Sequence, residues 1–285
     1  MNPTSIFKNI EIPLFPFPKT VMNYIFANGK PRHYKKLNKT CKYIFIKYQR
    51  NCVDWIHLQE DYVYYDEDPE PKPVFERYKF LTRFEKDFAL LPSNLMFSSA
   101  LELNRATTIL YKTLMPKIVI CNIGSLTMMR SADFLYDDFK FLTNSGRIQT
   151  LNLYDTKIIY PNGDPVEIEN ILAKVINAWF ITLNPVHITQ NTMKNLLEIQ
   201  WGRPILMMLR LTKIDNNYFQ PDQFFELLQK IASMSVMKGH DRYIVEFKDP
   251  IKTQEFNIIL SKMVKEYKEP VPEAEKKEVV KDKEK

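Results

Sequence analysis

IQTLNLYDT, residues 148 to 156, carries apolar side chains at Ile148, Leu151 and Leu153 and polar ones between them. The same apolar-x-x-apolar-x-apolar arrangement occurs in MPKIVICNI from residue 115, INAWFITLN from residue 176 and LMMLRLTKI from residue 206. The second apolar positions, at steps of 33, 28 and 30 residues, are Ile118, Leu151, Trp179 and Leu209. A nearly constant period of this length predicts that the chain repeats one structural unit.

Weaker copies of the pattern extend the series in both directions. They are VDWIHL around Ile56, EKDFAL around Phe88 and HDRYIV around Tyr243. A helix is predicted after each strand, because start signals such as Asp164-Pro165 and Pro221-Asp222 precede apolar residues at helical spacing. One strand and one helix in every 30 or so residues predict stacked units that share a parallel sheet.

Two α/β architectures are compatible with this alternation. In a doubly wound sheet the strands are buried on both faces and read as nearly continuous apolar runs. Here Asn152, Tyr154, Arg210 and Thr212 interrupt the strands, which favours a sheet with one open face. The period and the L-x-x-L-x-L core resemble a leucine-rich repeat, in which each unit buries its apolar face only by stacking on its neighbours. We therefore expect an irregular, leucine-rich-repeat-like α/β arc over residues 53–267.

A small helical module is expected ahead of the repeats, at residues 10–52. Pro18 can open a helix because its missing N–H would be unpaired in the first turn, and Asn28-Gly29 can close it. A second run, from Leu37 to Cys52, again has apolar residues at helical spacing. Residues 268–285 combine mixed charge with no periodic apolar face, which predicts a disordered tail.

Positive charge is concentrated in this first module. The whole chain has a formal net charge of +6. Residues 1 to 50 contain ten Lys or Arg residues and one acid, which gives +9 and leaves −3 for the rest. The partner of the module is therefore expected to be acidic. Phosphate binding would use the same charge, but no helix-turn-helix or RNA-binding signature accompanies it, so nucleic acid is the disfavoured partner.

The composition also indicates in which cellular compartment the protein is expected. No run of eighteen apolar residues and no signal-peptide pattern are present, so we expect neither a membrane span nor a membrane partner. Three cysteines are too few for a disulfide framework and fit a reducing environment. The expected location is intracellular, in the cytoplasm, the nucleus or both.

Catalytic and cofactor motifs are missing from the sequence. Six glycines supply no G-x-G-x-x-G and no G-x-x-x-x-G-K-[ST] loop, and no G-x-S-x-G elbow occurs. The best metal candidates have spacings that match no usual zinc pattern; they are His33, Cys41, Cys52 and His57. We therefore expect no enzyme activity, no catalytic residue, no metal and no cofactor.

The module resembles an F-box, the short helical unit that binds a Skp-type adaptor of a cullin-RING ubiquitin ligase. Phe17-Pro18 stands where the family has leucine-proline, Val21-Met22 and Ile25-Phe26 follow as apolar pairs, and Cys41-Lys42-Tyr43 closes the pattern. The remaining chain is similar in style to the large, divergent F-box families of nematodes. The adaptor-binding residues implied by the resemblance are Phe17, Pro18, Val21, Met22, Ile25, Phe26, Leu37, Cys41 and Tyr43.

The resemblance implies a substrate-recognition subunit that bridges the adaptor, and through it a cullin, to an unknown target protein. The target-binding candidates are strand residues expected to face outward, namely His57, Gln59, Asn152, Tyr154, Phe180, Thr182, Arg210 and Thr212. Two alternatives stay open: a nucleic-acid-binding protein that uses the basic module, and a non-catalytic repeat scaffold.

Overall fold

The computed structural model describes residues 51–58, 74–76, 79–82, 85–201, 206–214, 218–231 and 243–266, with Pro18, Thr20, Val21, Tyr24, His33, Lys36 and Leu37. Most of the predicted module 10–52 and all of the predicted tail 268–285 lie outside these residues. The chain divides into two compact units, Met1–Ile148 and Gln149–Lys285. The predicted repeat region 53–267 thus contributes to both units.

The first unit contains a mostly parallel set of strands. They are β1 (Asn51–Leu58), β2 (Val74–Glu76), β3 (Lys79–Thr82), β4 (Leu95–Asn104), β5 (Ile118–Cys121), β6 (Ser125–Met129) and β7 (Phe134–Leu135). The order is β6-β4-β1-β3-β2, and β5 also pairs with β4. Strands β3, β4, β5 and β6 make parallel pairings, whereas β2 runs antiparallel to β3.

The second unit has strands β8 (Thr150–Tyr154), β9 (Ile158–Ile159), β10 (Phe180–Asn184), β11 (Met208–Ile214) and β12 (Tyr243–Phe247). Four of them lie side by side in the order β12-β11-β10-β8, and every pairing among these four is parallel. The predicted α/β class with a mostly parallel sheet is confirmed.

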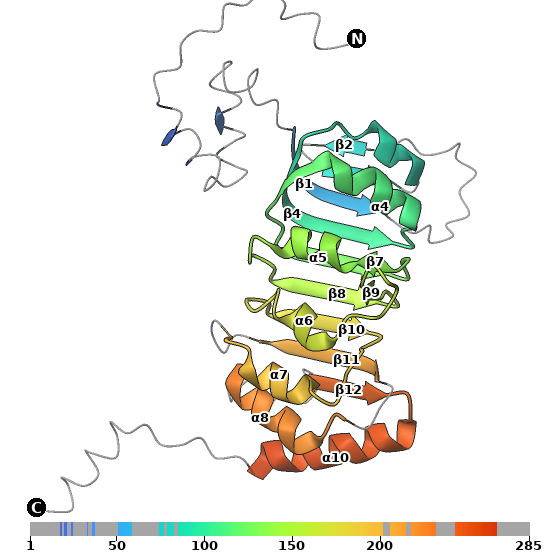
Figure 1. Ribbon diagram of the computed structural model, residues 1–285, viewed down its shortest axis with the longest axis vertical. Helices are drawn as coiled ribbons and strands as arrows, with labels where there is room; N and C mark the ends of the chain where they lie inside the picture. The colour runs from blue at the N-terminus through green and yellow to red at the C-terminus, as the bar shows by residue number, and fades with distance from the viewer. Residues whose placement is uncertain are drawn as a thin grey trace, which may run out of the picture. The chain divides into compact units, whose positions relative to one another are not determined.

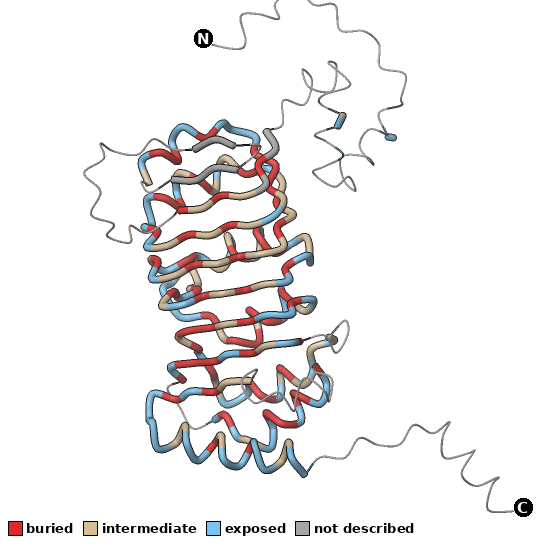
Figure 2. The backbone as a smooth tube through the Cα atoms, turned by 180° about the vertical axis from the view of Figure 1, so that it is seen from behind, coloured by how far each residue is buried: buried red, intermediate tan, exposed pale blue. Residues whose placement is uncertain are grey.

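Helices lie on one face of the strands in each unit (Figure 1). The first unit has η2 (Glu85–Leu90), α4 (Thr108–Leu114), η3 (Met115–Lys117) and α5 (Tyr136–Thr143). The second has α6 (Ile168–Leu172), α7 (Thr192–Glu198), α8 (Pro221–Ile231) and α10 (Pro250–Glu266). The view from behind shows the strands without helices in front of them (Figure 2), so each unit leaves one sheet face open rather than covering both faces as a doubly wound sheet does.

The strand register of the second unit corrects one predicted alignment. Leu151, Ile181 and Leu209 lie side by side on β8, β10 and β11, each fully buried. Trp179, which was expected to share this place with Leu151, lies before β10 and is 41% exposed. Because strand side chains alternate with period two, a slip of two residues leaves the apolar pattern intact and cannot be detected from the sequence.

Of the strands predicted at the three weaker copies of the repeat, two are confirmed and one is wrong. Ile56 lies in β1 and Tyr243 lies in β12, as expected. Phe88 is fully buried but belongs to the 3-10 helix η2, so the strand predicted there is wrong. In this part of the chain the buried leucines that lie side by side on paired strands are instead Leu101 of β4 and Leu126 of β6. A short apolar cluster fits a helix and a strand equally well, and this explains the error.

One predicted helix start is confirmed and one is wrong. Helix α8 begins at Pro221. Helix α6 begins at Ile168 rather than near Pro165, because Pro165 forms a bridge with Ile159. The chain reverses between them through Gly163, whose φ is +90°. Glycine adopts this backbone region without a steric cost.

The turns that follow the strands repeat one backbone conformation. Arg105, Arg130 and Asp155 have φ between 49° and 55°, and each comes two residues after the last buried apolar residue of its strand, as Asp155 does after Leu153. Lys213, with φ 56°, lies within β11, two residues after the buried Leu211. Neighbouring turns of the same unit are bonded to each other. Arg105 N–H donates to Met129 O at 2.8 Å, and the Ser131 hydroxyl accepts from Ala106 N–H at 3.1 Å.

The outer edge of β12 is bonded by side chains of α10. Thr253 Oγ1 accepts a hydrogen bond from Phe247 N–H at 2.8 Å. Asn257 Nδ2 donates to Val245 O at 3.1 Å. Backbone groups of an edge strand that would otherwise face solvent are therefore paired within the unit.

Cys121 provides a pH-dependent test of the core of the first unit. The residue is buried, and burial raises the pKa of its thiol from 9.0 to about 12. The unfolded chain therefore loses the thiol proton near pH 9.0, while the folded chain keeps it. As a result, the contribution of Cys121 to the free energy of unfolding is complete below pH 9.0 and is lost as the pH rises toward 12. Because only the thiolate is alkylated, we expect iodoacetamide at pH 8.5 to modify Cys121 in urea but not in the folded protein. Equal labelling in both, resolved by peptide mass spectrometry, would contradict the burial of Cys121.

Candidate functional site

The open face of the second unit brings together most of the residues predicted to bind a target. Strand alternation directs them away from the buried leucines, and the register arranges them in three rows across β8, β10 and β11. The first row holds Thr150, Phe180 and Met208. The second holds Asn152, Thr182 and Arg210, and the third holds Tyr154 and Asn184, with Thr212 two residues beyond Arg210 on β11.

Arg210 is the charged residue in the middle row. Its side chain is exposed and lies beside Thr182 on β10 and Ile244 on β12. Within the described part of the chain, Arg210 forms no ion pair and no side-chain hydrogen bond. A guanidinium presents five N–H donors in a fixed plane, so this face offers an unused site for an anionic group.

Apolar side chains border the row of Arg210 at the strand starts. Phe180 of the first row is 36% exposed; Trp179 and Met207, which precede β10 and β11, are 41% and 37% exposed but alternate with the buried Ile181 and Leu209. On the other side of the row, Tyr154 is 37% exposed. Aromatic residues and arginine are the residue types that contribute most of the binding energy at protein interfaces. The face thus combines apolar anchors with one cation.

The third row contains polar atoms that the fold leaves unsatisfied. Asn184 and Thr212 are each 5% exposed. Among the described residues, neither Asn184 Oδ1 nor Thr212 Oγ1 has a hydrogen-bond partner, and the same holds for Asn152 Oδ1. Buried polar atoms are almost always bonded, so three exceptions on adjacent strands mark this region as suboptimal for stability.

Lys213 differs from Arg210 although it lies only three residues away in the chain. Its Nζ is 2.5 Å from Asp155 Oδ1, which joins the end of β11 to the turn after β8. The hydrogen bond to Asp155 raises the pKa of the Lys213 ammonium. The charge of Lys213 is therefore already neutralised within the unit.

The first unit carries the other predicted target-binding residues, His57 and Gln59. His57 Nδ1 lies 3.3 Å from Glu102 Oε2, and its ring centroid is 5.5 Å from that of Trp55. The register places His57 opposite Glu102 on β4, with Trp55 two residues earlier on the same face of β1. Gln59 lies outside the described residues.

Three of the nine predicted adaptor-binding residues are described. Pro18 is exposed, Val21 is helical and 39% exposed, and Leu37 is helical and half-buried. The other six, which lie outside the described residues, are Phe17, Met22, Ile25, Phe26, Cys41 and Tyr43.

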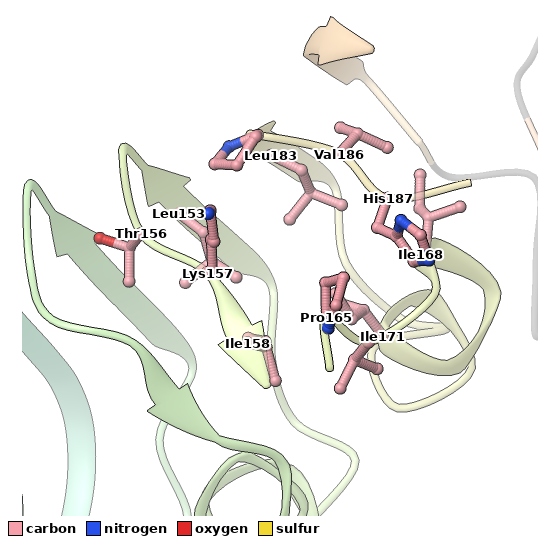
Figure 3. A pocket seen from close by; sticks show the side chains of 12 residues that line it. Leu153, Thr156, Lys157, Ile158, Pro165, Ile168, Ile171, Leu183, Val186 and His187 are labelled. Carbon is pink, nitrogen blue, oxygen red and sulfur yellow. The ribbon is translucent and has the colours of Figure 1, made fainter. Parts of the chain in front are cut away.

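A small apolar pocket lies on the other side of the second unit, between the ends of β8 and β10 and helix α6 (Figure 3). Its volume is about 110 Å³, and its walls include Leu153, Leu183 and Ile168, with Lys157 and His187 among the polar lining residues. No sequence motif pointed to it, because its walls come from segments far apart in the chain.

Beside this pocket, Glu167 belongs to a polar network. Tyr160 Oη donates to Glu167 Oε2 at 2.7 Å, and Asn170 Nδ2 donates to the same oxygen at 3.0 Å. Partial burial raises the pKa of the Glu167 carboxyl, but these hydrogen bonds outweigh it and the net pKa is lowered. The network joins the turn after β9 to the start of α6.

Several residues of the open face were not predicted. Asn184 shares the alternation of Phe180 and Thr182, so the period-two pattern could have identified it. Glu102 is a neighbour of His57 only through the pairing of β1 with β4, which no local pattern reveals.

Within the described ranges, no three His, Cys, Asp or Glu side chains lie close enough together to hold a metal ion. None of the helices in these ranges has both the length and the apolar character needed to cross a membrane. Comparisons with protein-family models, with curated proteins and with solved structures give no match to this chain.

Proposed function

We propose that this chain is a substrate-recognition subunit of a Skp-cullin-F-box type ubiquitin ligase. In this proposal, residues 10–52 bind a Skp-type adaptor, and the strand-and-helix units form a leucine-rich-repeat-like region that binds a target protein. The protein is not an enzyme itself and works inside the cell, in the cytoplasm, the nucleus or both. It acts by holding two proteins together.

The observation that supports target binding most strongly is the open face of the second unit. Exposed Phe180 lies diagonally from the unpaired Arg210, and exposed Tyr154 lies two strands away in the next row, on a sheet face that the helices leave uncovered (Figure 2). A surface of aromatic anchors around a charged residue matches the centre of a protein interface better than a merely solvated sheet.

The support for adaptor binding comes from the first 50 residues. Their charge of +9 complements an acidic surface, and complementary charge mainly speeds encounter. The paired apolar residues Val21-Met22 and Ile25-Phe26 supply the groups that hold such a complex. The 39% exposure of Val21 fits a side chain that is available to a partner.

The adaptor test uses the full-length chain and a purified Skp-type adaptor. We expect Ile25→Ala/Phe26→Ala to abolish capture of the adaptor, because each lost interface anchor costs about 2 kcal/mol or more in binding. The control is Ile258→Ala/Ile259→Ala, which removes two exposed apolar side chains of α10 and should bind as wild type does. Capture of both adaptor and cullin from cells extends the test to the ligase.

Failure of the wild-type chain to bind any Skp-type adaptor would overturn the ligase role. Recovery of DNA or RNA instead, with affinity that falls steeply with salt, would favour the nucleic-acid alternative. Retention of adaptor binding by the double variant would show that the apolar pair is not the contact.

A further inference from the structure

The charge environment of Arg210 in the second unit identifies the kind of target segment that fits the open face. On the three rows of this face, Arg210 is the single cation, and its neighbours Thr182 and Asn152 are neutral. Glu246 on β12 lies diagonally from it, since Arg210 is paired with Ile244. No carboxylate oxygen of the described residues lies within 4.0 Å of the guanidinium, so a ligand would not have to displace an internal partner.

The row spacing matches the geometry of an extended peptide. Successive rows are two residues apart along each strand, which is about 6.6 Å. Side chains that project to the same side of an extended peptide have nearly the same spacing. A peptide aligned with β11 can therefore place one side chain against Met208, beside Phe180, and the side chain two residues away against Arg210.

The side chains of the face define the chemistry of that peptide. The first-row neighbours Phe180 and Met208 suit an apolar side chain, and the 36% of Phe180 that is exposed is otherwise in contact with water. A guanidinium pairs with a carboxylate through two parallel hydrogen bonds. Recognition of phosphorylated residues generally uses several arginines, whereas this face has one. The charge balance thus favours a carboxylate.

We infer that the open face of the second unit binds an extended, acidic segment of a target protein, in which an Asp or Glu seated on Arg210 lies two residues from an apolar side chain seated on the neighbouring pair Met208 and Phe180. The inference rests on the proposed function for the statement that the segment belongs to a ligase target. Its binding chemistry can be tested separately.

The experiment probes the full-length chain with arrays of synthetic nine-residue peptides, each with a fixed residue at one position and mixed residues elsewhere. We expect peptides with Leu or Phe two positions from Asp or Glu to be retained about tenfold more than those with Asn or Gln in the acidic place. Arg210→Gln should remove this preference. Arg210→Glu should reverse it toward Lys and Arg.

The matched control is Lys194→Glu, which makes the same charge change at an exposed position of α7, on the helix-covered side. This variant should keep the wild-type preference. Circular dichroism checks that all three variants are folded, which is expected because both positions are exposed.

An acidic preference that persists in Arg210→Glu would overturn the inference, as would a preference for phosphoserine over Glu. If it fails while adaptor capture still depends on Ile25 and Phe26, the ligase role stands and the target site lies elsewhere. If Arg210→Glu reverses the preference but no adaptor is ever bound, the inference holds and the ligase role fails.

Discussion

Replacement of Phe256 by alanine should lower the free energy of unfolding by about 3–5 kcal/mol, the usual cost of removing a buried aromatic ring. Phe256 is 3% exposed, and its ring centroid lies 5.3 Å from that of Phe247 and 5.9 Å from that of Phe219. The buried residues of α10 are Phe256 and Leu260. The ring therefore supplies the buried aromatic contact of α10, beside Leu260 and the hydrogen bonds of Thr253 and Asn257 to β12.

The control for Phe256→Ala comes from the same helix. Ile258 and Ile259 are 62% and 49% exposed, so Ile258→Ala and Ile259→Ala should change the free energy of unfolding by no more than about 0.5 kcal/mol. Urea denaturation followed by circular dichroism measures all three variants. If Phe256→Ala and Ile258→Ala lowered the free energy of unfolding by similar amounts, α10 would not pack through the aromatic cluster.

Thr192→Val should lower the free energy of unfolding by about 2–3 kcal/mol, because it removes a buried hydroxyl that has two hydrogen-bond partners. Thr192 Oγ1 donates to Glu169 Oε2 at 2.8 Å and accepts from Thr189 N–H at 2.8 Å. Glu169 is 7% exposed and links α6 to the start of α7. Valine has the same shape but leaves one oxygen of the Glu169 carboxyl without this donor.

Thr212→Val is the matched comparison and should have the opposite sign. Thr212 is also buried, but its hydroxyl has no partner in the described part of the chain. Removal of an unsatisfied buried hydroxyl is expected to raise the free energy of unfolding by up to about 1 kcal/mol. A destabilised Thr212→Val, measured by the same urea titration, would mean that the hydroxyl is bonded in solution.

Much of the second unit could be predicted from its sequence. The pattern around Leu151 and Leu209 identified two strands, and the regular spacing correctly indicated parallel pairing. The outward residues, such as Thr182 and Arg210, followed from period-two alternation. Alternation survives a slip of two residues, so Thr182 and Arg210 lie on the open face although Trp179 was aligned wrongly with Leu151. Thr212, predicted to face outward as well, is only 5% exposed.

The turns and the partners within the site could not be predicted in the same way. Arg130 and Lys213 adopt positive φ values, although this backbone region disfavours residues other than glycine, asparagine and aspartate. Hydrogen bonds between neighbouring turns impose the conformation, and those bonds depend on the stacking. Likewise, the pairing of Lys213 and the unpaired state of Arg210 depend on which turns the fold brings together.

The bonds from Thr253 and Asn257 to the backbone of β12 have a consequence for how the protein behaves at high concentration. A parallel strand with free amide and carbonyl groups can act as a template on which another molecule adds its own strand, and repetition of that step produces fibrils. In this chain the side chains of α10 occupy Phe247 N–H and Val245 O. By pairing these groups, α10 should hinder edge-to-edge addition of further molecules as well as stabilise its own unit.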